Sequence, residues 1–186
     1  MRKLIAAINM TVDGFCDHTA ATPDDALMQY FNDLFRNADV EIFGRITYQL
    51  MEEYWPEVAK TQSDDKLNNE FAVLMDDIHK IVYSRTLESV DWKNTELKHE
   101  LVADDIIKLK QQTGKNILVG SPSLIVALTK LGLIDEYQLV VHPVILGSGL
   151  PLFKDISDSI DLKLTQSRTY ASGAVLLQYE LANRAA

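Results

Sequence analysis

Apolar residues along this chain form short continuous runs that alternate with longer, regularly interrupted stretches. The short runs have the length of buried β-strands and lie at residues 3–8, 39–43, 80–83, 116–119 and 137–141, with a weaker strand expected at 95–98. Two more strands are predicted at 162–170 and 175–181, joined through Ala171-Ser172-Gly173 as an antiparallel hairpin. Residues 9–21 are mostly polar and are expected to form a loop after the first strand.

The interrupted stretches have the spacing of amphipathic helices. The clearest helix is predicted to start at Thr22-Pro23-Asp24-Asp25, which offers a cap, a first-turn proline and two acids, and its apolar stripe falls at 27, 30, 31, 34 and 35. A second helix is predicted from Arg45 to just before Trp55-Pro56. Further helices are expected between 63 and 77, from 104 to 112, and from the N-cap Ser121 and Pro122 up to Gly132.

This alternation of strands and helices predicts an α/β fold. We expect a mostly parallel central sheet with helices on both faces, which makes three layers, and a C-terminal antiparallel hairpin. With 186 residues and 47% hydrophobic content, residues 1–186 are predicted to form a single domain with its own core.

Charge and cysteine content narrow the choice of partners and compartment. The 18 basic and 27 acidic residues give a net charge of −9 without a basic stripe, which argues against nucleic acid and anionic membranes as partners. No apolar run is long enough to cross a bilayer, and the single Cys16 rules out an intramolecular disulfide and a multi-cysteine zinc site. We therefore expect a cytoplasmic protein.

Three predicted strands end in small, polar or basic residues: Gly44-Arg45-Ile46-Thr47, Ser84-Arg85-Thr86 and Gly120-Ser121. Ligands of open α/β sheets bind beyond the carboxyl ends of the strands. A helix N-terminus suits a pyrophosphate, and Arg with Ser suits a 2′-phosphate, as in an NADP(H) site. One such turn would more simply be a crossover with a solvated arginine, but three in one sheet favour a site. Gly147-Ser148-Gly149 lacks a following helix and is not a dinucleotide fingerprint.

Acid–base chemistry has few candidates. Asp24 and Asp25 stand at a helix start, where acids usually complement the dipole, so we interpret them as structural. Asp13 and His18 in the polar loop remain as catalytic candidates, although Asp13-Gly14 also suits a plain turn and His18 a surface position. The other histidines have no metal-ligand spacing and no G-x-S-x-G occurs, so neither a metal nor covalent catalysis is expected.

Four segments in this order resemble the dihydrofolate reductase-like superfamily, and within it single-domain relatives of the riboflavin-biosynthesis reductase domain. They are residues 10–15 (MTVDGF), 43–48 (FGRITY), 117–121 (ILVGS) and 142–153 (HPVILGSGLPLF). The resemblance implies a three-layer dihydrofolate reductase-like fold and an NADPH-dependent reductase. The reaction it implies is the reduction of a heterocyclic small molecule, such as 5-amino-6-(5-phosphoribosylamino)uracil in riboflavin biosynthesis.

The resemblance also assigns expected cofactor contacts. Ala7 would lie beside the nicotinamide, and Gly44, Arg45 and Thr47 would hold phosphates. Ser84 and Arg85 would bind the 2′-phosphate end. The pyrophosphate would lie against the segment that contains Gly120, Ser121, Ser123 and Leu124.

The expected substrate contacts are Asp13, His18, Tyr48 and the loop of Gly147, Ser148 and Gly149. Met28 is added because an ungapped count back from Gly44-Arg45 places it where dihydrofolate reductases carry their helical acid. Dihydrofolate reductase activity, a non-catalytic nucleotide-binding module and a structural interaction domain remain alternatives. The edge strands of the C-terminal hairpin, through which relatives pair, lead us to expect a homodimer.

Overall fold

The computed structural model describes residues 1–17, 19 and 22–182. Within these residues, eight strands form one sheet in the order β4-β3-β2-β5-β1-β6-β8-β7. The strands are β1 (Leu4–Thr11), β2 (Ala38–Gly44), β3 (His79–Tyr83), β4 (Thr95–Lys98), β5 (Asn116–Val119), β6 (Glu136–His142), β7 (Leu162–Thr169) and β8 (Val175–Leu181). Strands β1 to β6 run parallel, and β8 and β7 add an antiparallel edge. The predicted α/β class, mostly parallel sheet and terminal hairpin are confirmed.

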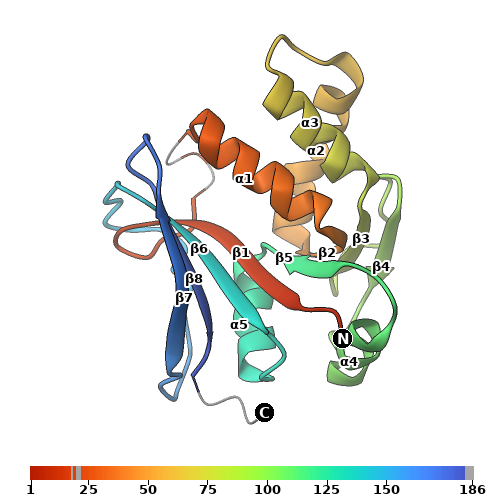
Figure 1. The fold of residues 1–186 in the computed structure, drawn as a ribbon. Coiled ribbons are helices and arrows are strands. Elements are labelled where there is room, and N and C mark those ends of the chain that lie inside the picture. Colours follow the sequence, from red (N-terminus) through yellow and green to blue (C-terminus); the bar gives the residue numbers. More distant parts are fainter. Residues whose placement is uncertain (18, 20–21, 183–186) are drawn as a thin grey trace.

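Helices cover both faces of this sheet. They are α1 (Asp25–Arg36), α2 (Arg45–Thr61), α3 (Lys66–Asp77), α4 (Ala103–Gln111) and α5 (Pro122–Lys130). Figure 1 shows α1, α2 and α3 on one side of the sheet and α4 and α5 on the other. Successive side chains along each strand point to opposite faces of the sheet, and two hydrophobic cores result. Phe43, for example, packs toward α1–α3, whereas Ile42 packs toward α4 and α5.

Strand β1 lies in the middle of the sheet, between β5 and β6. It continues to Thr11, which pairs with His142, so residues 9–11 are strand and the predicted loop begins later. Pairing with β6 overrides the polar character of Asn9 and Thr11. The carboxyl end of β1 therefore lies beside that of β6, while β5 ends earlier, where Val119 pairs with Ala6.

Two predicted helix boundaries are wrong. Helix α2 does not stop before Trp55-Pro56 but runs through Pro56 to Thr61. The indole of Trp55, which directly precedes the proline, packs on the ring of Phe71 from α3 with centroids 4.7 Å apart, and this tertiary contact offsets the lost backbone hydrogen bond. Helix α1 is capped by Asp24, whose carboxylate accepts from Leu27 N at 2.8 Å, and not by Thr22.

None of the helices in the described residues is long and apolar enough to cross a membrane.

Candidate functional site

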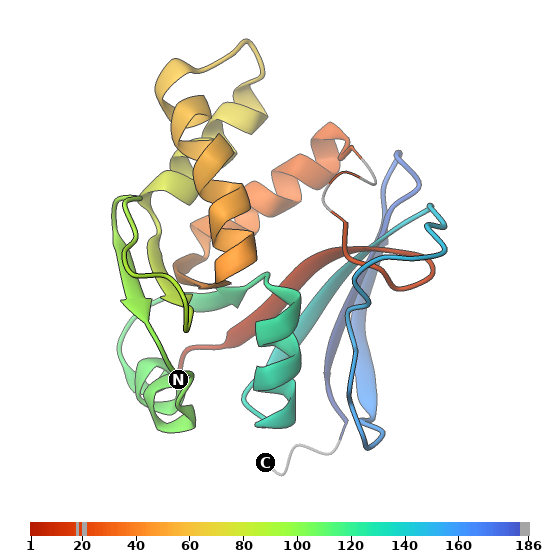
Figure 2. The ribbon, with the colours of Figure 1, turned by 180° about the vertical axis from the view of Figure 1, so that it is seen from behind.

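A hydrogen bond joins the ends of β2 and β5 at the carboxyl edge of the sheet. The Gly44 amide donates to the Ser121 hydroxyl oxygen at 2.8 Å, and both groups are buried. Ser121 stands at the predicted N-cap of α5, but its side chain bonds across to β2 instead of back to its own helix. In Figure 2 the start of α5 accordingly lies beneath the start of α2.

The space around this junction is narrow. A Cβ on Gly44 would lie 3.5 Å from the Ser123 hydroxyl oxygen, and one on Gly120 would lie 3.3 Å from the Ala7 carbonyl oxygen. The glycines thus let neighbouring strand ends approach closely. Two helix N-termini meet here, and the free amides and dipoles of both give this edge a positive character.

A cleft of about 220 Å³ opens at the same edge. Ala7 from β1, Leu118 from β5 and Gly120 form part of its lining. Phe31 and Phe35 from α1 contribute aromatic walls. Of the residues predicted to contact the cofactor, Ala7, Thr47 and Gly120 line this cleft, and the structure thus brings together three segments that are far apart in the sequence.

The cleft also contains an acid that the sequence analysis passed over. Glu41 of β2 is 6% exposed and its carboxyl lines the cleft, with Oε2 buried and without a hydrogen-bond partner. Burial raises the pKa of Glu41 to about 8, and the nearby Lys80 ammonium only partly opposes this. The available signal was a carboxylate between the apolar residues Val40 and Ile42 of a predicted buried strand, where such a group is costly to bury.

Lys80 lies opposite Glu41 on β3 but is committed elsewhere. Its Nζ donates to the carbonyl oxygens of Met75, Asp76 and Ile78 at 2.8–3.0 Å, at the C-terminal end of α3. The ammonium also lies 4.4 Å from the centroid of the Trp92 ring. Lys80 therefore neutralises the negative end of a helix dipole, and the Glu41 carboxyl keeps its unpaired oxygen.

Asp13 holds a second loop against the end of β1. It accepts from the Thr11 hydroxyl at 2.6 Å and from the amides of Leu146 and Gly147, and these hydrogen bonds hold its pKa below the usual range. Asp13 and the glycine loop, both expected as substrate contacts, thus lie together. A carboxylate held in its ionised form anchors the loop well but suits proton donation poorly.

The strand end after β3 contributes a structured turn. Ser84 is buried, and its hydroxyl oxygen accepts from the amides of Thr86 and Leu87 at 3.2 and 3.0 Å. Arg85 is exposed beside it. Because β3 neighbours β2, both residues lie on the predicted edge, with Arg85 free to reach an anion and Ser84 occupied by the turn.

Several other predicted contacts are not among the residues that line the cleft. Tyr48 is 1% exposed and packs against Phe43 and Trp92, with its hydroxyl donating to Glu52, so the structure does not bring it to the cleft. Met28 packs into the core beneath α1, and Leu124 into the opposite core. Arg45, Ser123, Ser148 and Gly149 are exposed. His18 lies outside the described residues.

Asp24 is structural, as predicted: besides capping α1 it accepts from the Ser172 amide at 2.7 Å. This bond ties α1 to the turn between β7 and β8. Among the described residues, no group of three or more His, Cys, Asp and Glu side chains is arranged to hold a metal ion.

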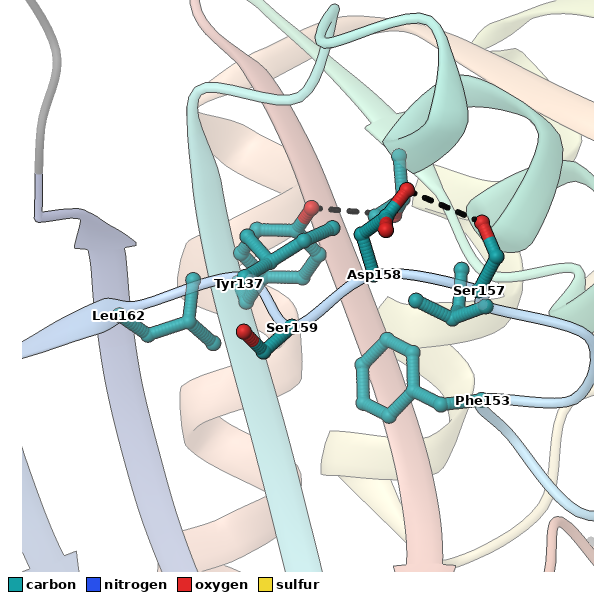
Figure 3. A pocket seen from close by; sticks show the side chains of 9 residues that line it. Tyr137, Phe153, Ser157, Asp158, Ser159 and Leu162 are labelled. Carbon is teal, nitrogen blue, oxygen red and sulfur yellow. Dashed lines mark hydrogen bonds between the residues drawn. The ribbon is translucent and has the colours of Figure 1, made fainter.

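A second cavity, of about 320 Å³, lies at the other end of β6. Figure 3 shows it between the start of β6, α5 and the segment from Phe153 to Leu162. Thr129 and Tyr137 share a hydrogen bond of 3.0 Å there, and the Ser157 hydroxyl donates to Asp158 at 3.1 Å. Its polar groups satisfy one another, and it is remote from the strand ends that the sequence singled out.

Comparison with known proteins agrees with this arrangement. Residues 2–176 match the RibD C-terminal domain. The uncharacterized protein YyaP of Bacillus subtilis (strain 168) is 34% identical over 182 residues, which cover 96% of this chain and 94% of that protein. The chain therefore belongs to the RibD C-terminal domain family, a family of reductases, and this supports an oxidoreductase-like function.

Two solved structures show the same fold. A putative riboflavin biosynthesis protein from Shewanella sp. PV-4 superposes with a TM-score of 0.74 at 20% identity, over 97% of this chain and 99% of the other. Dihydrofolate reductase from Enterococcus faecalis, in a complex with NADP(H), superposes with a TM-score of 0.63 at 12% identity, over 97% of each chain. The fold is thus dihydrofolate reductase-like, as the sequence predicted.

Proposed function

We propose that this protein is an NADPH-dependent reductase of a flat heterocyclic small molecule of the pyrimidinone or pteridine class. The observation that carries the proposal is the fastened junction of Gly44 and Ser121 beside an apolar cleft with a floor of small residues. Membership of a reductase family supports the same reaction class.

The residues at this edge fit a nicotinamide dinucleotide. The Ala7 and Gly120 backbones leave room for a flat ring, since any side chain on Gly120 would crowd the Ala7 carbonyl oxygen at 3.3 Å. The first turns of α2 and α5, with Arg45 and Thr47, would hold the phosphates, and Arg85 would hold the 2′-phosphate. When bound, the cofactor supplies the hydride.

The chain's own contribution is to bind and orient the two reactants and to exclude water. The aromatic walls from Phe31 and Phe35 suit a planar ring, and Leu150 from the glycine loop also lines the cleft. Holding both rings in contact accounts for much of the rate enhancement in such a transfer. A dihydrofolate-type acid on α1 is absent from the expected position, because Met28 stands there.

A thermal-shift titration with NADPH and with NADH tests the proposal. Only binding to the native state raises the melting temperature by mass action, and we expect a larger rise with NADPH. Arg85→Ala should weaken the binding of NADPH by about tenfold or more and leave the binding of NADH nearly unchanged, because only NADPH carries the 2′-phosphate. No shift with either nucleotide would contradict the proposal, and equal losses for both would remove Arg85 from this role.

A further inference from the structure

The floor of the cleft contains a carboxyl group that the fold itself leaves without a partner. Glu41 is 6% exposed, and its Oε2 is buried with no hydrogen bond to any described residue. Buried polar groups in native proteins are nearly always paired, so an unpaired buried oxygen on a residue that lines a cleft calls for an explanation. The nearest cation, on Lys80, is engaged by three carbonyl oxygens and does not supply one.

This carboxyl lies next to the place expected for the reacting rings. Glu41 Oε1 lies 3.7 Å from the point where a Cβ on Gly120 would stand, and the Ala7 carbonyl oxygen lies 3.3 Å from the same point. The acid is therefore beneath the part of the floor that lacks side chains. Phe31, Phe35 and Leu118 surround this floor with apolar surface, which leaves Glu41 as a polar group at its base.

Other titratable groups around the cleft are less suited to give up a proton. Asp17 accepts from the amide and the hydroxyl of Thr19. Burial raises the pKa of the Cys16 thiol to about 11, so it keeps its proton throughout the neutral range. Lys80 lies opposite the acid on β3 and is engaged by three backbone carbonyl oxygens.

We propose that Glu41 is the catalytic acid of this cleft, hydrogen-bonding the edge of the heterocycle and giving its proton to a ring nitrogen. The inference rests on the proposed reductase function and names the group that completes it. A neutral carboxylic acid both donates and accepts, which matches a pyrimidinone or pteridine edge that places an N–H donor next to a C=N nitrogen acceptor. Its burial keeps the acid neutral at the pH where it must act.

The step balances with the nicotinamide as the reductant. A C=N bond of the heterocycle accepts a hydride at carbon from NADPH and a proton at nitrogen from the Glu41 carboxyl. The products are the reduced C–N bond with its new N–H, NADP⁺ and the Glu41 carboxylate. Water entering after product release returns the proton to Glu41.

Binding and infrared spectroscopy test this role without turnover. The probe is lumazine, a pteridine-2,4-dione, titrated calorimetrically near neutral pH into the wild-type protein, Glu41→Leu and the surface control Glu88→Gln. We expect Glu41→Leu to weaken lumazine by about tenfold or more, through loss of a buried hydrogen bond, with Glu88→Gln equal to wild type. The carbonyl band of a buried protonated carboxyl should be present in the wild type, shift on addition of lumazine, and vanish in Glu41→Leu.

Each result decides a separate point. Equal lumazine affinity in the wild type and in a folded Glu41→Leu, or a carboxyl band that lumazine does not shift, would overturn the role of Glu41. A wild-type protein that does not bind lumazine would overturn it too, since the heterocycle then does not reach the acid. Wild-type NADPH stabilisation in the same preparation shows that the proposed cofactor function survives, whereas its loss would count against that function instead.

Discussion

Glu41 is a residue whose ionisation opposes folding. Its pKa is about 8 in the folded protein, against 4.5 for an exposed glutamate, so the folded state retains a proton that the unfolded chain releases between these values. The free energy of unfolding should therefore fall as the pH rises from about 4.5 to about 8, by at most roughly 5 kcal/mol. Glu41→Gln, which cannot ionise, should remove this slope.

Urea unfolding at about pH 5 and about pH 7.5 measures the effect in the wild type, Glu41→Gln and Glu88→Gln. Most of this interval lies below the range in which Lys80 titrates. Burial lowers the pKa of Lys80 to about 8, so the opposite slope that Lys80 adds begins only near the upper point. We expect Glu88→Gln to keep the wild-type slope. If Glu41→Gln keeps it as well, Glu41 is not buried in its neutral form.

At the scale of the elements, the junction between β2 and β5 should support both stability and nucleotide binding. Ser121→Ala removes the acceptor of the Gly44 amide and leaves that buried donor unpaired, which should cost about 1–3 kcal/mol of unfolding free energy. Because the same bond sets the two helix starts, NADPH-induced stabilisation should weaken too. The exposed Ser123 provides the control, and Ser123→Ala should leave the unfolding free energy within about 0.5 kcal/mol of the wild type. A Ser121→Ala protein as stable as Ser123→Ala would show that the junction bond contributes nothing.

The same junction shows which features of the fold could be predicted from the sequence and which could not. The strand ends at Gly44 and Gly120 were predictable, because glycine and serine after a buried strand mark the start of a crossover helix. The bond from Gly44 to Ser121 was not, since it depends on the order of strands in the sheet, which local patterns do not encode. Helix α2 passed through Pro56 for a similar reason, namely a tertiary contact between Trp55 and Phe71.

In the candidate site, too, some features could be predicted from the sequence and others could not. Small residues such as Ala7 and Thr47 could be assigned to the cleft by resemblance, and they line it. The sequence alone could not exclude Tyr48 from the cleft, because the burial of Tyr48 depends on which face of α2 meets the sheet. Glu41 carried a signal of its own, an acid in a buried strand, but only the three-dimensional structure shows that the cleft opens above it.

At the scale of the whole molecule, β7 gives the sheet a long exposed edge. Seven of its eight residues are exposed, and Leu164 is 49% exposed, whereas β4 at the other edge has only four residues. An open edge of unpaired amides and carbonyls is a template for another strand, and a twofold axis would pair it with β7 of a second copy. We therefore predict a homodimer through this edge.

Light scattering after gel filtration should give about twice the chain mass of 21.0 kDa. Leu164→Lys replaces an exposed apolar side chain of this edge with a charge and should yield monomers, because charged residues on an edge strand disfavour pairing with another strand. Leu131→Lys, at the C-terminal end of α5 and also exposed, is the matched control and should leave the dimer intact. A wild-type mass of one chain would contradict the prediction, and a Leu164→Lys dimer would move the interface elsewhere. Because the cleft lies beyond the strand ends and β7 forms the far edge of the sheet, NADPH-induced stabilisation should survive in the monomeric variant.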